Sequence, residues 1–219
     1  MGTYPRGDVD ETAAPPGTRA ERRERATADT RATILAAARS RLLAVGYANL
    51  STRAVAEEAE VPLSQIHYHF GSKQQLILAV LEGENERLLQ RQRGLFGGPE
   101  PLWQQWDRAC DYLDEDLESG YVRVLQEMIA AGWADAEVAA AVRRFWGGWF
   151  RLLAEVAEAA ASRIRGGLGP FEPAELALLM GLPFNGAEEA ILLGFTEAEF
   201  PARSALRKVG AVIRALEER

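Results

Sequence analysis

Apolar residues recur at steps of three and four along most of this chain from Asp29 onward, and this spacing places them on one face of an α-helix. Glycine, proline or aspartate stands at plausible ends of the segments, and strand-like alternation rich in Val, Ile and Thr is absent. The pattern therefore predicts an all-α fold of about nine helices without a sheet. Beyond residue 95, helices are expected at residues 101–118, 121–131, 135–165, 173–193 and 201–217.

Length and composition exclude several classes of protein. The chain has 219 residues, of which 47% are hydrophobic and 26% charged, so it can bury a core. No run approaches the 18 or so apolar residues that a membrane span needs, and the N-terminus lacks the apolar core of a secretory signal. The single cysteine, Cys110, cannot form an internal disulfide and suits a reducing compartment. We therefore expect a cytoplasmic protein with no membrane partner.

The charge is unevenly distributed along the chain. The formal net charge is −7, but residues 1–93 hold 13 of the 25 basic residues and 12 of the 32 acidic ones, so the acidic excess lies further on. This suits an N-terminal DNA-binding domain joined to an acidic body, although many other soluble proteins share it. Residues 1–26 have no periodicity and are expected to form a flexible tail, whose arginines can contact DNA as basic arms do.

Residues 51–70 have the pattern of two short helices joined by a tight turn. The first is expected to end near Ala59, Pro62 stands just before the second, and Gly71 follows Phe70 where the second ends. Such a pair needs a third helix behind it, which residues 29–45 can supply. The arrangement predicts a helix-turn-helix domain over residues 27–75, whose second short helix enters the major groove of DNA.

The segment GYANLSTRAVAEEAEVPLSQIHYHFGSKQQLILAVL, from Gly46 to Leu81, resembles the N-terminal domain of the tetracycline-repressor (TetR) family. Matches in order and spacing are Ala59 with Val61, the run Tyr68-His69-Phe70, and Ser72-Lys73 with Leu76. With the helix before it, the resemblance covers roughly residues 28–90. It implies that residues 76–219 form a helical domain for ligand binding and dimerisation.

Three positions depart from the family pattern. Glu60 stands where the family usually has glycine, so the turn must form without the residue that most easily adopts a positive φ. Pro62 replaces the usual Ser or Thr cap, and His67 replaces a tyrosine that often contacts a phosphate. A histidine can donate the same hydrogen bond, so these changes affect the operator sequence and the fine geometry more than the fold.

The predicted DNA contacts fall into two groups. Gln65 can pair with adenine, Leu63 can touch a thymine methyl group, and Ser64 lies beside them early on the recognition helix. The others are expected to contact phosphates, which set the register of the protein without reading sequence. These phosphate contacts are Thr52, Arg53, His67, Tyr68 and Lys73.

Aromatic residues are dense in the C-terminal part, where all five Trp residues lie beyond residue 100. They favour a pocket for an apolar or aromatic ligand over a plain core. The expected lining is Trp103, Trp106, Asp107, Met128, Trp146, Phe150 and Phe184. Arg123 and Glu127 are further candidates for a polar anchor.

The last two helical segments are apolar over wide faces, as expected for the two late helices that form the dimer interface in TetR-like proteins. The predicted interface residues are Leu179, Leu182, Ala187, Ala190, Ile191, Leu206, Val209 and Ile213. Internal packing alone is the alternative explanation. A two-fold dimer implies a palindromic operator.

Together these features predict a dimeric transcriptional repressor that is released from its operator by a small molecule; activation is the alternative within this interpretation. No cofactor is expected. His67 and His69 project about 200° apart on a helix, so they do not favour a metal site. The alternatives are a helical interaction module that does not bind DNA and, with no catalytic motif in its support, an all-α enzyme.

Overall fold

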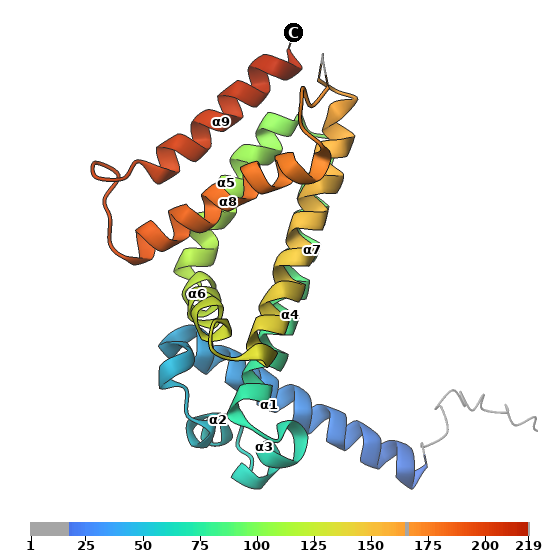
Figure 1. Ribbon diagram of the computed structural model, residues 1–219. Helices are drawn as coiled ribbons and strands as arrows, with labels where there is room; N and C mark the ends of the chain where they lie inside the picture. The colour runs from blue at the N-terminus through green and yellow to red at the C-terminus, as the bar shows by residue number, and fades with distance from the viewer. Residues whose placement is uncertain (1–17, 165–166, 219) are drawn as a thin grey trace, which may run out of the picture.

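The computed structural model describes residues 18–164 and 167–218, and over these residues the chain forms nine helices and no strand (Figure 1). The expected all-α architecture is confirmed. The helices are α1 (Arg19–Asn49), α2 (Thr52–Glu58), α3 (Leu63–Phe70), α4 (Lys73–Phe96), α5 (Leu102–Glu118), α6 (Tyr121–Gly132), α7 (Ala136–Ala161), α8 (Pro173–Leu192) and α9 (Ala202–Glu217). No helix of the described residues is both long and apolar enough to cross a membrane.

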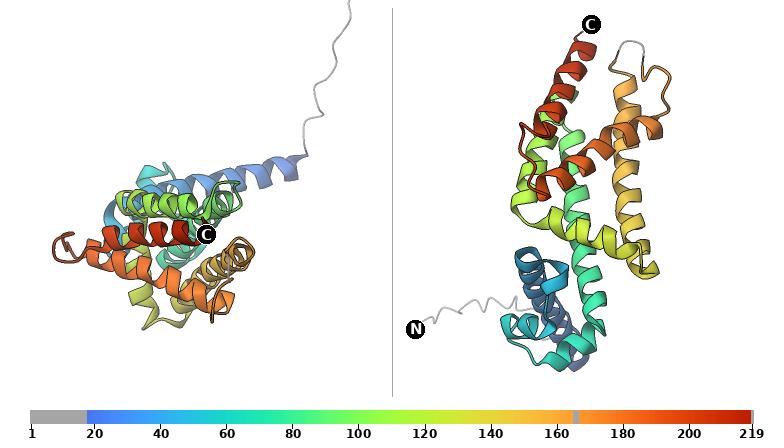
Figure 2. Two further views of the ribbon diagram at one scale, coloured as in Figure 1. Left: turned by 90° about the horizontal axis from the view of Figure 1, so that it is seen from above. Right: turned by 60° about the vertical axis from the view of Figure 1, so that its left-hand side comes forward.

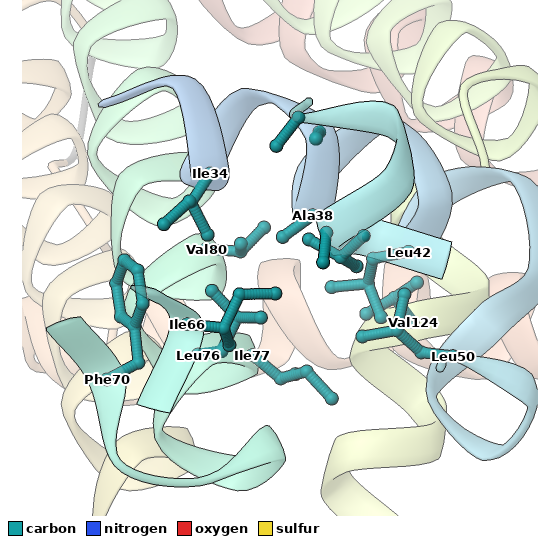
Figure 3. Close-up of a cluster of buried hydrophobic side chains, with 14 of the residues drawn as sticks. Ile34, Ala38, Leu42, Leu50, Ile66, Phe70, Leu76, Ile77, Val80 and Val124 are labelled. Carbon is teal, nitrogen blue, oxygen red and sulfur yellow. The ribbon is translucent and has the colours of Figure 1, made fainter. Parts of the chain in front are cut away.

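Helices α1 to α3 and the start of α4 form a small unit at one end of the molecule, around a core of aliphatic side chains (Figure 3). Ile34 of α1, Ile66 of α3 and Leu76 of α4 are each fully buried in it. Ser72 caps α4 by accepting a hydrogen bond from the backbone N–H of Gln75 at 3.1 Å. Helix α4 then runs from this unit along the body to its far end (Figure 2).

The turn between α2 and α3 is made by a residue with a positive φ that is not glycine. Glu60 has φ 53°. Its N–H bonds to Glu57 O, and the next N–H, of Val61, bonds to Ala56 O at 3.0 Å, which is the Schellman pattern that ends many helices. Glu60 thus makes this turn with a positive φ where the family usually has glycine, at the cost of strain at Glu60.

The body shares the core of the small N-terminal unit. Val124 and Met128 of α6 and Val138 of α7 are buried in the same apolar cluster as the side chains of α1, α3 and α4. Helix α6 therefore presents one face to this core. Movement of α6 cannot leave the three-helix unit unaffected, because close-packed cores transmit displacement.

Polar contacts also join the C-terminal end of α1 to α6. The Tyr47 N–H donates to the Glu127 carboxylate, and the Arg123 guanidinium donates to Leu43 O at 2.7 Å. Gly46 and Gly120 adopt φ 80° and 83°, and a Cβ on either would collide with Glu127 or with the Leu43 carbonyl. Arg123 and Glu127 therefore hold the two parts together, and they are not polar anchors of a ligand.

In the rest of the body, α5, α8 and α9 pack around a second apolar cluster. Trp106 of α5 is buried there, and its Nε1 donates to Leu206 O at 2.7 Å, which ties α5 to α9. Helix α8 crosses α7 obliquely on one side of the body, and α9 lies outside α5 (Figure 1).

Some boundaries differ from the sequence prediction. The predicted tail over residues 1–26 is wrong from Arg19 onward, because α1 begins there, with a capping box between Thr18 and Glu21; residues 1–17 lie outside the described part. Gly46, expected to end the first helix, is a non-helical kink followed by three more residues of α1. The segment expected over 135–165 ends earlier, at Ala161.

Replacing Glu60 with glycine is expected to raise the free energy of unfolding by about 1 kcal/mol, because glycine removes the strain of a Cβ at positive φ. The measurement is urea denaturation followed by circular dichroism. The matched control is Glu60→Ala, which removes the same carboxylate but keeps a Cβ. Equal stability of the two variants would show that Glu60 is not strained.

Replacing Glu127 with alanine is expected to lower the free energy of unfolding by about 1–2 kcal/mol, because the half-buried N–H of Tyr47 loses its acceptor. Thermal unfolding measures the change. Glu86→Ala, at an exposed position on α4, is the control for loss of a glutamate. If both variants unfold at the same temperature, the link between α1 and α6 does not contribute to stability.

Candidate functional site

Helix α3 presents a polar outer face opposite its buried side. Ile66 and Phe70, four residues apart, point inward and are 0% and 8% exposed. Ser64, His67 and Tyr68 point outward, and Tyr68 is 71% exposed although it is a large aromatic residue. An aromatic side chain left in solvent on a short helix is suited to contact a partner surface.

The remaining predicted DNA contacts surround this face at different depths. Arg53 is exposed near the start of α2, and Thr52 and Gln65 are half-buried. Leu63 is also half-buried and packs partly against the core, which limits its reach toward a base. The Lys73 ammonium lies 3.4 Å from Ala48 O and 5.4 Å from the centre of the Tyr47 ring, so it is held beside the end of α1.

The N-terminal part of α1 adds basic side chains to the same surface. Arg19, Arg23 and Arg31 line an open groove that Tyr68 also lines. The guanidinium of Arg31 lies 5.2 Å from the centre of the Phe70 ring. Arg19 and Arg23 fall within the predicted tail, and Arg31 was not among the predicted DNA contacts. The three arginines are four and eight residues apart, so they lie on one side of the helix.

A cavity lies inside the body between α4, α5, α6, α7 and α8. Its volume is about 60 Å³, which is room for a few water molecules. Most of its wall is aromatic or aliphatic, but polar side chains from four helices interrupt it. They include Gln92 of α4, Asp116 of α5, Tyr121 of α6, and Asn185 and Glu188 of α8.

Two of the residues predicted to line a pocket, Trp106 and Phe184, line this cavity, and their rings meet edge to face at 5.3 Å. Met128 instead lines a neighbouring cavity of about 260 Å³ between α4, α6 and α7. Tyr121, Leu125 and Phe145 belong to the walls of both.

The other predicted lining residues lie outside both of these cavities. Trp103 lies under the guanidinium of Arg214, 4.9 Å away, and Asp107 lies beside Gly210 of α9. Trp146 and Phe150 pack edge to face at 6.0 Å, on a part of α7 that lines neither cavity. The neighbouring Trp149 lines the first cavity instead, because one position along a helix turns a side chain by about 100°.

The polar groups of the first cavity have unusual protonation equilibria. Burial raises the pKa of Glu188 to about 7, even though the Gln126 amide donates to its Oε2 at 3.0 Å. Burial also raises the pKa of Asp116, against the opposing effect of its ion pair with Arg91. The pKa of the buried Tyr121 phenol is raised well above its usual value by burial and by these carboxylates. Sequence reasoning missed all three, since no local motif marks them.

The predicted interface residues divide between the surface and the core. Leu179 and Leu182 are 54% and 46% exposed on α8. In contrast, Ala187, Ala190, Leu206 and Ile213 are buried within the chain, and Ile191 and Val209 pack half-buried against the cluster of α5, α8 and α9, so internal packing explains all six. Other large apolar side chains are exposed on the same two helices. They are Leu178, Leu192, Val212 and Leu216.

Comparison with known proteins identifies the N-terminal unit. Residues 34–80 match the model of the family described as bacterial regulatory proteins, tetR family. This segment runs from the buried face of α1 through α2 and α3 to the first turns of α4. No curated protein matches the chain.

Solved structures share the fold along most of the chain. A TetR-family regulator from Haloarcula marismortui superposes with a TM-score of 0.69 at 19% identity, covering 86% of this chain and 98% of that chain. A putative TetR-family regulator from Rhodococcus sp. gives 0.67 at 20% identity, with 85% and 98% covered. A putative regulator from Saccharomonospora viridis, solved in complex with choline, gives 0.67 at 18% identity, with 83% and 95% covered.

The family match of the N-terminal unit and the fold shared with solved structures therefore lead to the same conclusion. Residues 34–80 match the tetR family of bacterial regulatory proteins, and the chain shares its overall fold with solved structures of tetR-family regulators.

Proposed function

We propose that this regulator is a repressor that binds a palindromic operator as a homodimer and leaves it when a small molecule with apolar or aromatic parts enters the body. The observation that carries the proposal is the first cavity, which α4, α5, α6, α7 and α8 enclose, because α4 connects this cavity to the unit formed by α1, α2 and α3. The proposed DNA contacts are those predicted from the sequence, with Arg19, Arg23 and Arg31 of α1 added.

Binding to DNA would use the outer face of α3. Ser64 and Gln65 are near the N-terminal end of the helix, which is the end that a helix-turn-helix protein brings to the base edges. Tyr68 and Lys73 would contact the phosphate backbone, with the arginines of α1 alongside. This division gives affinity through the backbone and specificity through Gln65.

The coupling would run through two helices that reach both sites. Leu88 and Phe96, in the second half of α4, line the cavity, whereas Leu76 and Ile77, in its first half, are buried beside α3. Helix α6 likewise has Tyr121 at the cavity. A ligand that favours a different placement of α4 and α6 would change the distance between the recognition helices of a dimer. A coupling of about 1–3 kcal/mol would change operator affinity roughly 5- to 150-fold.

The dimer would form through the exposed apolar side chains of α8 and α9. Leu182 lies about one turn after Leu178 and Leu179 on α8, so the three form one continuous surface, and Val212 of α9 is 59% exposed. Monomeric proteins seldom leave so many large apolar side chains in solvent on two adjacent elements. Two-fold pairing here would present two recognition helices to the DNA about 34 Å or somewhat more apart.

Replacing Gln65 with alanine is expected to weaken binding to the selected operator by about 1–3 kcal/mol and to relax specificity at one base pair. Lys73→Ala should weaken binding to all sequences alike and reduce the slope of log affinity against log salt by about 1. The operator is first selected from a random DNA pool with the full chain, and fluorescence anisotropy then gives affinity over a range of salt concentrations.

The control for these variants is Arg143→Ala, which removes a positive charge from an exposed site on α7. It should leave affinity and salt slope unchanged. If the full chain selects no sequence from the pool, or if binding does not depend on salt, the chain is instead a helical interaction module that has kept the scaffold.

Replacing Leu182 with glutamate is expected to convert the dimer to a monomer and to weaken binding to a palindromic site more than tenfold, because a charge would be buried at the interface. Sedimentation velocity measures the state, and circular dichroism checks the fold. Trp133→Glu is the control, since Trp133 is 85% exposed but lies at the turn before α7. A Leu182→Glu variant that stays dimeric would contradict this interface.

A further inference from the structure

We propose that the cavity between α4 and α8 binds an organic ammonium ion, with the cationic group received by the Glu188 carboxylate and the apolar part by the aromatic wall. The inference rests on the proposed function, because it names the chemical class of the ligand that the regulator would sense. Three features of the cavity support the inference. They are the charge of its lining, the unpaired polar atoms in its wall and the aromatic side chains that form much of the remaining wall.

The first feature is charge. Two carboxyl groups, of Asp116 and Glu188, line the cavity. Among the described residues, no Lys, Arg or His lines it. Arg91 is the nearby cation, but its guanidinium is paired with Asp116 at 2.5 Å, so it neutralises that carboxyl group and not Glu188. An anionic ligand would meet repulsion here. A cation would meet an acceptor that has only a neutral amide, from Gln126, as its partner.

The second feature is an unpaired acceptor next to the carboxyl group. Asn185 is three residues before Glu188 on α8, so both side chains lie on the same face of the helix, and both line the cavity. The buried Oδ1 of Asn185 has no hydrogen-bond partner among the described residues, and neither has the buried Nε1 of Trp149, a donor in the same wall. Buried polar atoms are nearly always paired, so the unpaired acceptor beside a carboxyl group indicates a ligand that donates or carries positive charge, and the unpaired Trp149 donor can be satisfied by an acceptor on the same ligand.

The third feature is the aromatic wall. Phe145 and Trp149 of α7, Tyr121 of α6 and Phe184 of α8 all line the cavity. Aromatic faces attract cations electrostatically, and the attraction is strongest where water is excluded. The face of Tyr112 is already occupied, because the guanidinium groups of Arg91 and Arg108 lie 4.1 and 4.6 Å from its centre. The wall is therefore suited to an alkyl or aryl group attached to nitrogen.

Protonation of Glu188 gives the proposal a measurable signature. Its pKa of about 7 results from burial, and the carboxylates of Asp116 and Glu189 raise it further while Gln126 lowers it. The other charged or titratable groups around it are Tyr121 on α6 and Arg91 on α4, whose charge Asp116 compensates. A bound cation favours the ionised carboxylate, so binding below pH 7 must release a proton. Affinity should then fall about tenfold per pH unit below the pKa and level off above it.

The test uses two probes of nearly the same shape, 2-phenylethylammonium and the uncharged 2-phenylethanol, titrated into the full chain without DNA by isothermal calorimetry. At pH 8 the ammonium ion is expected to bind at least tenfold more tightly than the alcohol. Between pH 8 and pH 5.5 its affinity should fall by more than tenfold, while that of the alcohol changes little. Titrations in buffers with different ionisation enthalpies should show release of close to one proton at the lower pH.

The matched variants are Glu188→Gln and Glu189→Gln, which remove the same charge from neighbouring positions on α8; Glu189 is exposed. Glu188→Gln keeps a group that can bond to Gln126, and it should remove both the preference for the ammonium ion and its pH dependence. Glu189→Gln should retain both. Circular dichroism of each variant checks that α8 is intact.

The proposal is overturned if the alcohol binds as tightly as the ammonium ion, if neither probe binds, or if Glu188→Gln keeps the preference for the cation. Operator binding is measured separately on the same preparations. Loss of the proposed function would appear there as an absence of DNA binding, whereas failure of the cation inference would leave DNA binding intact.

Discussion

The structure depends on one apolar core that belongs to both parts of the molecule. Val124 and Met128 of α6 are buried with the aliphatic residues of α1, α3 and α4, so helix α3 does not rest on an independent domain. The hydrogen bond from the Tyr47 N–H to Glu127 and the bond from Arg123 to Leu43 O hold α1 against the same helix. Because the packing is continuous, the position of α6 and the position of α3 are linked by contact and not by a flexible connection.

Helix α6 is short but borders the shared core, both cavities and the C-terminal end of α1. Successive residues on a helix point in different directions, so Val124 faces the shared core while Tyr121 and Leu125 face the cavities. The polar bonds to α1 come from Arg123 and Glu127, on a third part of its surface. A helix with all its faces in use cannot rotate without disturbing at least one neighbour. This is the property that a two-state coupling element requires.

How far the sequence predicts the molecule depends on how local the determining interactions are. The bounds of α3, Leu63 to Phe70, were predicted correctly because Pro62 and Gly71 act on the adjacent backbone. The start of α1, at Arg19, was not predicted correctly. Its first ten residues are exposed on all sides, so they lack the apolar period that reveals a packed helix, and the capping box at Thr18 was not recognised.

The candidate cavity was predictable only in kind. The density of aromatic residues after residue 100 favours a pocket, and of the predicted lining residues the first cavity has Trp106 and Phe184 in its wall. The choice between Trp146 and Trp149 needs the rotation of α7 about its axis, which its neighbours decide. Glu188 and Tyr121 are brought together by packing between helices that are distant in sequence. The same reason explains why buried Ala187 and Leu206 were mistaken for interface residues.

The size of the cavity connects ligand binding to movement. About 60 Å³ is too little for a drug-sized ligand, for which pockets of roughly 300 Å³ or more are usual. The space available next to it, about 260 Å³, is separated from it by side chains common to both walls, among them Tyr121 and Phe145, whose rings meet at 6.4 Å. A ligand larger than the first cavity must displace this pair. Tyr121 is on the helix that carries Val124 and Met128, and Phe145 is on the helix that carries Val138, so the displacement acts directly on the core behind the recognition helix.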